Sequence, residues 1–184
     1  KAGPDYRLTG WLDSCPGRYL EQYARLRGRM STEVPLGGTD YRAEAWDGAR
    51  VRRSEDELRR QGGHALVAAV EHLPGDGLAG YTFAEYSAEK PRVLYQEATL
   101  VLPAPRGRGL ALLLKAANLL RIMDHWPAGR SLYTWNAAEN SPMLGINTAL
   151  GFVPAGCEAA WQKRTGGPQG SPPGPDLVGR GAFP

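Results

Sequence analysis

The sequence has few cysteines, few histidines and no long apolar run, and each shortage excludes a class of protein. The 2 cysteines, Cys15 and Cys157, lie far apart among 184 residues and are expected to be free thiols. The 3 histidines are scattered, and no cysteine pair has the spacing of metal ligands, so no metal site is predicted. No apolar run approaches the roughly 20 residues that a membrane helix needs, and Lys1 to Asp13 contains no apolar signal segment. We therefore expect a cytoplasmic protein without a membrane partner.

An excess of charge is also missing. The formal net charge is +3 and the isoelectric point is about 9.0, which is not the signature of a nucleic-acid binder. The basic residues are mostly arginine, with local clusters at 25–29, 50–53, 59–60 and 106–108. The first three clusters are expected on solvated helix faces. The fourth coincides with a glycine-rich loop, and no nucleic-acid partner is predicted.

What is present fits one globular domain followed by a tail. A hydrophobic content of 42% in 184 residues is enough for a sizeable core. After Thr165, glycine and proline dominate the sequence and cannot bury a core. We therefore predict a domain over residues 1–164 and a disordered tail over residues 165–184.

Periodic patterns predict a sheet with helices. Alternation and turn signals predict an antiparallel meander of three strands, at 64–72, 78–86 and 93–102. Helical spacing predicts helices at about 19–30, 47–61, 110–126 and 141–150. A further strand is expected at 131–135, and a closing hairpin from 152–153 and 158–164. The helix after residue 110 is apolar on most sides, with one polar stripe that should form its wet edge: Lys115, Asn118, Arg121 and His125.

A strand, a glycine loop and a helix meet between Val101 and Ala111. The first amides of a helix have no intrahelical partner, and the helix dipole adds partial positive charge there, so the arrangement favours an anion such as phosphate. Gly107 and Gly109 allow close approach of the backbone to a ligand. The loop does not contain G-x-x-x-x-G-K-[ST] or G-x-G-x-x-G, so it is neither a P-loop nor a dinucleotide fingerprint. By itself it is equally compatible with a tight strand-to-helix turn.

Two ordered blocks carry a resemblance to a known family. Arg106, Gly109 and Ala111 fill the fixed positions of [QR]-x-x-G-x-[GA], the acyl-CoA signature of the Gcn5-related N-acetyltransferase (GNAT) superfamily. Downstream, residues 134–136, 140–143 and 150–152 resemble the strand, helix and N…GF segment of that family. The chain most resembles the second domain of actinobacterial tandem acetyltransferases related to mycothiol synthase.

The resemblance implies a fold and a cofactor. The fold is α+β, sandwich-like, with a mixed but mostly antiparallel sheet of six to seven strands and about four helices. The cofactor is acetyl-CoA or another acyl-CoA. The resemblance assigns the pantetheine arm and the thioester to Leu100, Val101 and Leu102. It assigns the pyrophosphate to Arg106, Gly107, Arg108, Gly109, Leu110 and Ala111.

The resemblance leaves the proton-transfer groups open. Glu97 is a candidate base, and alternation places it on the same face as Tyr95, Thr99 and Val101; Glu85 is the second candidate. For each of them the alternative is a solvent-facing carboxylate, which is the commoner case. Asn140 is expected to bind the pantetheine arm or an active-site water, or simply to cap a helix.

The family's usual acid is absent. Many members carry a tyrosine four residues before the glycine of the GF pair, where this chain has Asn147. Asparagine can hydrogen-bond to the cofactor but is not a comparable proton donor. Tyr95 and Tyr133 are the available substitutes, and nothing in the sequence places their hydroxyl groups.

The acceptor side and the activity remain as alternatives. The resemblance makes a loop between the first two helices overhang the acceptor; its candidate contacts are Glu33, Asp40, Tyr41, Glu44 and Trp46. One hypothesis is an N-acetyltransferase acting on a small-molecule or peptide amine. The other is a degenerate GNAT domain that binds CoA or packs beside a catalytic domain. The expected protein partners are a preceding GNAT domain or a second copy of the chain.

Overall fold

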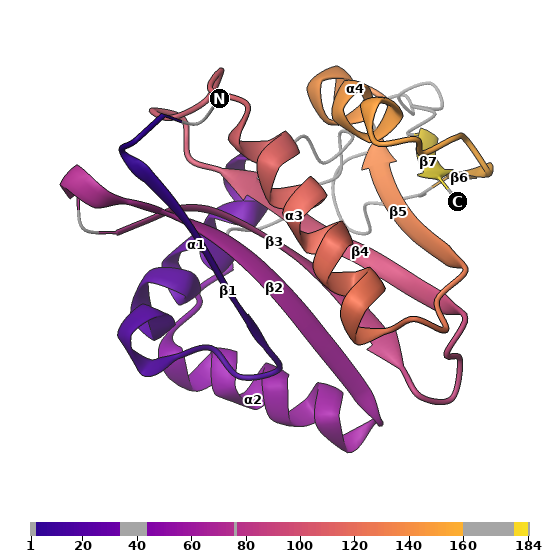
Figure 1. The fold of residues 1–184 in the computed structure, drawn as a ribbon, viewed down its shortest axis with the longest axis horizontal. Helices are drawn as coiled ribbons and strands as arrows, with labels where there is room; N and C mark the ends of the chain where they lie inside the picture. The colour runs from indigo at the N-terminus through magenta and orange to yellow at the C-terminus, as the bar shows by residue number, and fades with distance from the viewer. Residues whose placement is uncertain (1–2, 34–43, 76, 160–178, 184) are drawn as a thin grey trace, which may run out of the picture.

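The protein is a seven-stranded sheet with helices on both faces (Figure 1). The structure, a computed structural model, describes residues 3–33, 44–75, 77–159 and 179–183. The strands are β1 (Tyr6–Leu12), β2 (Gly63–His72), β3 (Gly77–Ser87), β4 (Val93–Val101), β5 (Ser131–Ala137), β6 (Gly156–Ala159) and β7 (Gly179–Phe183). Their order is β1-β2-β3-β4-β5-β7-β6, and only the β4–β5 pair is parallel. The described part contains four α-helices, so the predicted α+β class is confirmed.

Two helices cover one face of the sheet and one covers the other (Figure 1). The helices α1 (Leu20–Glu33) and α2 (Gly48–Arg60) pack over a cluster that contains Trp11, Val67 and Tyr81. The helix α3 (Leu110–His125) packs over two smaller clusters on the opposite face. The helix α4 (Ser141–Ala149) follows β5. Because β2 and β3 are covered on both faces, they are almost continuously buried and their apolar pattern does not alternate.

The polar stripe of α3 faces the sheet, not water, which corrects the sequence-based expectation. Lys115 and Asn118 are buried, and the Nδ2 of Asn118 donates to the carbonyl oxygen of Leu66 at 3.1 Å. The Nη1 of Arg121 donates to the carbonyl oxygen of Val67 at 2.7 Å. These polar side chains lie inward because backbone oxygens of β2 accept hydrogen bonds from two of them. His125 alone is exposed, as expected.

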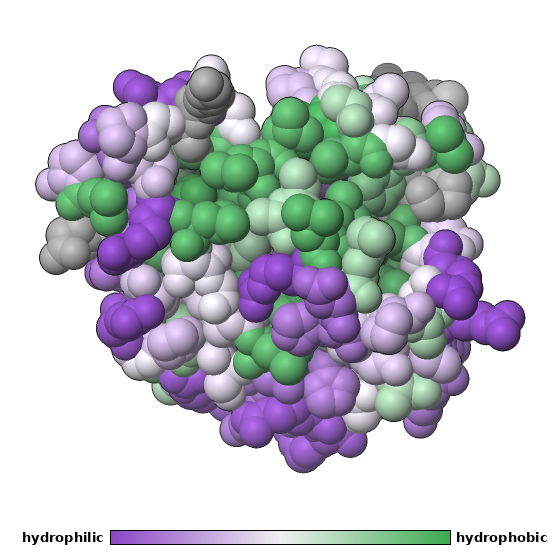
Figure 2. Space-filling model, viewed as in Figure 1, coloured by the Kyte–Doolittle hydropathy of each residue, from purple (hydrophilic) through white to green (hydrophobic). Residues whose placement is uncertain are grey.

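The outward side of α3 is apolar instead. Leu120 and Met123 are 66% and 68% exposed, and Leu112 and Leu113 are exposed as well. Figure 2 shows the resulting apolar patch over α3. Despite this composition, α3 is too short to cross a membrane, and no helix in the described ranges is long and apolar enough to do so.

The last two strands differ from the predicted closing hairpin. Residues 152–153 form no strand, and β6 pairs with β7, which also pairs with β5. The strand β7 lies inside the segment predicted to be a disordered tail, so the prediction is corrected for residues 179–183, whose backbone pairs with two neighbours. Residues 165–178 lie outside the described residues. The domain boundary at residue 164 stays a prediction.

Candidate functional site

The strands β4 and β5 pair at one end only. Their parallel register covers Val93, Leu94 and Tyr95 of β4, although β4 continues to Val101. From Thr134 onward, β5 pairs with β7 instead. The two strands diverge toward the end of β4 that precedes α3 (Figure 1). The edge of β4 after Tyr95 therefore offers backbone groups to an extended ligand, as an open strand edge does.

A β-bulge lies within this open part of β4. Thr82 pairs with Thr99 and Ala84 pairs with Gln96, so Phe83 of β3 lies opposite both Glu97 and Ala98. The extra residue reverses the alternation after Glu97. Ala98 and Leu100 pack with the α1/α2 cluster, while Val101 packs under α3. The prediction that Glu97 shares a face with Thr99 and Val101 is therefore wrong.

A buried polar network holds the bulge. The Nε2 of Gln96 donates to the carbonyl oxygen of Phe83 at 2.7 Å and to the Oγ1 of Thr82 at 2.9 Å. The hydroxyl oxygens of Thr82 and Thr99 are 2.7 Å apart. These positioning residues were not singled out from the sequence, because a bulge has no signal in a strand pattern. Glutamine and threonine at positions that alternation assigns to a buried face were the available hint.

The glycine loop has the geometry of a strand-to-helix cradle. Gly107 and Gly109 adopt left-handed conformations, with φ of 80° and 73°. Gly109 is the N-terminal cap of α3 and provides no side-chain cap. A Cβ added at either glycine would meet nothing within 4 Å, so space for a ligand lies beside both. The first amides of α3 are left for that ligand.

The loop arginine is held by an acid from α1. Arg106 donates through Nε to the carbonyl oxygen of Val101 at 3.1 Å and through Nη2 to the Oε2 of Glu33 at 3.0 Å. Glu33 also pairs with Arg29 at 2.9 Å. Glu33 was expected to contact the acceptor, but the structure places it against Arg106 of the glycine loop.

We expect the change Glu33→Gln to strengthen acyl-CoA binding by about two- to fivefold, because it removes a carboxylate that competes with phosphate for Arg106. Isothermal titration at low ionic strength measures the effect. The same change in an Arg106→Ala background should have no effect, which is the control. If Glu33→Gln, with Arg106 intact, left the affinity for acyl-CoA unchanged, Glu33 would not compete with the phosphate for Arg106.

Two carboxylates and one guanidinium meet above the bulge. Glu85 of β3 is half-buried and Glu97 of β4 is exposed at the edge of the site. Partial burial raises the pKa of Glu85, nearby Glu97 raises it further, and Arg27 lowers it. Surrounding atoms partly desolvate the carboxyl group of Glu97 and raise its pKa, although the residue as a whole is exposed, and Arg27 opposes this effect. A carboxylate with a raised pKa is a better proton acceptor, as a general base requires.

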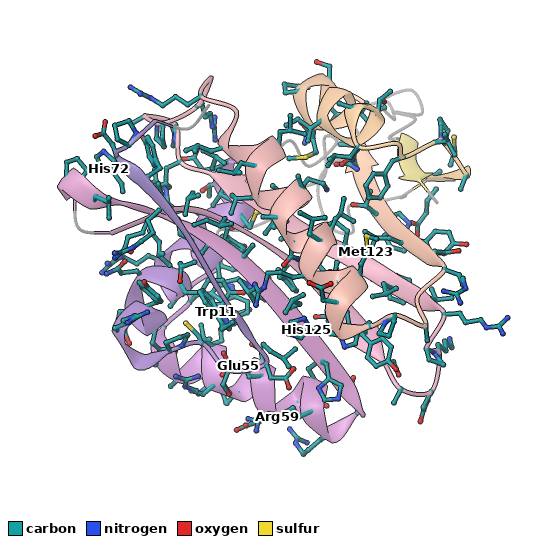
Figure 3. All side chains as sticks on the ribbon, viewed as in Figure 1. Trp11, Glu55, Arg59, His72, Met123 and His125 are labelled. Atoms are coloured by element: carbon teal, nitrogen blue, oxygen red, sulfur yellow. The ribbon has the colours of Figure 1, made fainter. Side chains whose placement is uncertain are left out.

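The same face contains a small cavity. Its volume is about 60 Å³, and it is lined by residues of β1, β2, β3, α1 and α2 that include Trp11, Tyr23, Arg27, Glu55 and Glu85. In Figure 3, Trp11, Glu55 and Arg59 lie on the α1/α2 side, apart from Met123 and His125 of α3. The cavity therefore lies beside Glu85 and Phe83, next to the bulge.

The expected acceptor contacts separate in the structure. Two guanidinium groups lie over the Trp46 ring, with the Cζ of Arg27 4.2 Å and the Cζ of Arg50 4.3 Å from the ring centroid. Glu44 accepts hydrogen bonds from the Nε1 of Trp46 and from Arg50. Asp40 and Tyr41 lie outside the described residues. Arg27 is half-buried, so its predicted place on a solvated helix face is wrong.

Asn140 and Asn147 of the α4 segment and Lys115 of α3 carry polar groups near the site. Asn140 caps α4, its Oδ1 accepting from the amide of Met143 at 3.4 Å. Asn147 is fully buried, and neither its Nδ2 nor its Oδ1 has a partner among the described residues. Lys115 is buried too, and its Nζ lies 5.4 Å from the centroid of the Phe152 ring. Burial lowers the pKa of Lys115 to about 8.

The two substitute tyrosines lie where β4 and β5 still pair. Tyr95 and Tyr133 are register partners, and their ring centroids are 6.4 Å apart. The Tyr95 ring also stacks on Trp135 at 5.9 Å. They form an aromatic floor at the start of the divergence, so the structure leaves their acid role a prediction.

The two cysteines do not pair with each other. Cys15 is buried and Cys157 exposed, and both are free. Burial, together with Glu55, raises the pKa of the Cys15 thiol to about 12. Within the residues described, no group of three or more His, Cys, Asp or Glu side chains is placed to hold a metal ion.

Comparisons with known proteins agree with this geometry. No family model matches the chain. The mycothiol acetyltransferase of Nocardia farcinica (strain IFM 10152) is 32% identical over 112 residues, which is 60% of this chain and 35% of that protein. A tandem GNAT protein from the clavulanic acid biosynthesis pathway matches 98% of this chain and 45% of its own, with 26% identity and a TM-score of 0.68. The spermidine N-acetyltransferase of Vibrio cholerae, in complex with CoA and spermine, matches 98% of this chain and 95% of its own, with a TM-score of 0.66 and 13% identity, and so shows the fold alone.

The diverging strands, the bulge and the glycine loop of this chain lie on a fold that it shares with proteins named as acetyltransferases. The chain resembles members of the GNAT superfamily in sequence and in fold. It spans about a third of the curated relative and less than half of the tandem protein.

Proposed function

We propose that the chain is an acyl-CoA-dependent N-acyltransferase that transfers acetyl from acetyl-CoA to a primary amine of a small molecule or peptide. The supporting observation is that one unpaired strand edge connects the two parts of the site. The open edge of β4 leads from two carboxylates at the bulge to a glycine cradle at the start of α3. Direct attack in a ternary complex requires the amine and the thioester to be held side by side, and positioning of this kind supplies much of the rate.

The described residues fit acyl-CoA. Left-handed Gly107 and Gly109 leave open space beside the first amides of α3, which suits a pyrophosphate. Arg106 and Arg108 supply charge next to that space. Leu100, Val101 and Leu102 remain the proposed contacts for the pantetheine arm and thioester, because β4 does not pair with β5 after Tyr95. The amide of Leu102 already donates to the carbonyl oxygen of Ala79, and the carbonyl oxygen of Val101 accepts from Arg106. Asn140 and Asn147 are proposed to face the same arm, and the unpartnered polar atoms of Asn147 support this.

The groups proposed to take the proton of the amine are the carboxylates at the bulge. The amine must lose a proton before it attacks, and Glu97, with Glu85 as the second candidate, accepts that proton. A carbon–nitrogen bond forms, the carbon–sulfur bond breaks, and CoA leaves as the thiolate, which then takes a proton. Asn140 is occupied as a helix cap, and its proposed role is limited to orienting the cofactor or a water molecule.

One observation favours the alternative, a degenerate GNAT domain with a structural or CoA-binding role. The family's usual acid position holds Asn147, which is fully buried and cannot donate a proton comparably. Both alternatives predict CoA binding, and only the enzyme predicts turnover. The assay is release of CoA thiol from acetyl-CoA across a panel of primary amines. Turnover with any amine supports the enzyme; CoA binding without turnover supports the alternative.

A protein partner is also proposed. The tandem relative is more than twice the length that this chain covers, and we infer that a second GNAT domain is the partner. Sedimentation of the chain, alone and with a candidate partner domain, separates this partner from a homodimer. The expected cytoplasmic location stays a prediction from the sequence.

A matched pair of variants at Gly109 tests the cradle. Asparagine and aspartate have the same size, and both tolerate a left-handed conformation. We expect Gly109→Asp to weaken acyl-CoA binding about 100-fold or more relative to Gly109→Asn, because a carboxylate a few ångströms from a pyrophosphate is strongly repelled. Titration at two salt concentrations measures the difference, which should shrink at high salt. Equal affinities would place the pyrophosphate elsewhere.

A further inference from the structure

Arg27 is a guanidinium group enclosed by aromatic rings. Its central carbon lies 4.2 Å from the ring centroid of Trp46, 5.0 Å from that of Phe83 and 5.7 Å from that of Tyr23. The side chain extends from α1 toward the bulge and is half-buried. Rings on several sides fix the plane of the group and exclude water from it, which strengthens its electrostatic interactions.

Most of its hydrogen-bonding capacity is unused. A guanidinium has five N–H donors. In the part of the chain that the structure describes, one of them is used, from Nη1 to the hydroxyl oxygen of Tyr23 at 3.3 Å. No ion pair found among these residues includes Arg27. Glu85 and Glu97 are near enough for Arg27 to lower the pKa of each, but neither is bonded to it.

The position of Arg27 connects it to the acceptor. Arg27 and Glu85 line the same cavity between the sheet and the helices α1 and α2. Glu97 lies on the bulge, opposite Phe83, whose ring contacts Arg27. The other charged residues that line the cavity are already paired: Asp13 with His64, Glu55 with Arg52 and Arg59 with Asp56. The groups left for an acceptor are the carboxylates of Glu85 and Glu97 and the guanidinium of Arg27. Carboxylates suit an ammonium group, and a planar guanidinium suits a carboxylate through two parallel hydrogen bonds.

We propose that Arg27 binds a carboxylate of the acceptor, and that the acceptor is an amino acid whose carboxylate lies within a few bonds of the reacting amine. This inference rests on the proposed function, since it names the acceptor class of the same site. The amine lies toward Glu97 and Glu85, and the carboxylate lies toward Arg27. An amine without a carboxylate leaves an enclosed guanidinium unpaired and binds less well.

The experiment compares α- and β-amino acids with their carboxamides, which have the same shape without the charge. Binding to the chain in the presence of CoA is followed by ligand-observed NMR, and turnover is followed by release of thiol. We expect the wild type to favour the carboxylate form by about 10- to 100-fold. Arg27→Met should abolish the preference, Arg27→Lys should retain part of it, and Arg25→Met, at an exposed position of the same helix, should retain all of it.

A second measurement, the pH profile, separates binding of the acceptor by Arg27 from the effect of its charge on Glu85 and Glu97. Arg27→Met removes a cation that lowers the pKa of both carboxyl groups, so the acid limb of the pH profile should move to higher pH with every acceptor. The preference for carboxylate over carboxamide changes only if Arg27 touches the acceptor.

The outcomes remain distinguishable from those of the proposed function. Carboxylate-dependent binding that Arg27→Met removes supports the inference even if no amine is acetylated, in which case the proposed function fails alone. Equal binding of acids and carboxamides by the wild type would overturn the inference, whether or not turnover occurs. So would a carboxylate preference that survives in Arg27→Met.

Discussion

Replacing Glu97 by glutamine is expected to lower kcat/KM about 100-fold or more at neutral pH, in the range of general-base catalysis. Glutamine keeps the shape of the side chain at the bulge but cannot accept the proton of the amine. Glu85→Gln should cost less, because β3 lies one strand further from the gap between β4 and β5. The double variant should resemble Glu97→Gln, since one proton needs one acceptor.

The pH dependence gives this prediction its control. Activity of the wild type should rise with pH through the raised pKa of the carboxyl group, above the ordinary value of 4.5. In Glu97→Gln that limb should disappear, and activity should recover at high pH as more of the amine is already neutral. If the two single variants and the double variant all retain activity within about threefold, neither glutamate is the base.

Replacing Lys115 by methionine is expected to stabilise the fold at pH 7, by about 2 kcal/mol. The lysine is buried, and burial lowers its pKa from 10.5 to about 8. That difference corresponds to up to about 3 kcal/mol, offset by about 1 kcal/mol from the lost contact with the Phe152 ring. The melting temperature should rise by about 4–8 °C, as expected for a domain of this size.

The sign of the pH dependence is fixed by the direction of the shift. Between about pH 8 and 10.5 the unfolded chain holds a proton on Lys115 that the folded chain does not. The contribution of Lys115 to stability should therefore rise with pH across this window, while Cys15, whose pKa is raised from 9.0 to about 12, contributes in the opposite direction above pH 9. Lys115→Met should lose that rise, and Lys90→Met, at an exposed turn residue, should keep it. Destabilisation by Lys115→Met at pH 7 would show that the ammonium group has a favourable partner.

The sequence predicted most elements because their periods were clear. The meander of β2, β3 and β4 and the helix α3 lie within a few residues of their predicted bounds. The orientation of α3 could not be predicted, because Asn118 and Arg121 are polar yet bond to carbonyl oxygens of β2. Hydropathy alone assigns such residues to water. The strand β7 was missed because a segment rich in glycine is held by pairing with distant strands, which composition does not encode.

For the candidate site too, local features could be predicted from the sequence and long-range contacts could not. The loop from Arg106 to Ala111 was found because its glycines are needed for local backbone conformation, and Gly107 and Gly109 are left-handed as such a loop requires. The role of Arg27 was missed because it depends on rings brought from β3 and from the segment before α2. The pairing of Glu33 with Arg106 joins residues that lie 73 positions apart. Long-range contacts of this kind have no local signal.

The most direct test of the account is titration of the unaltered chain with acetyl-CoA by calorimetry. The site predicts one molecule bound per chain with a micromolar dissociation constant, about −8 kcal/mol, and an affinity that falls with salt as phosphate contacts are screened. The signal should disappear in Gly109→Asp and persist in Gly109→Asn. Absence of binding by a folded wild-type chain would contradict the proposed cofactor site and the acyltransferase function that depends on it.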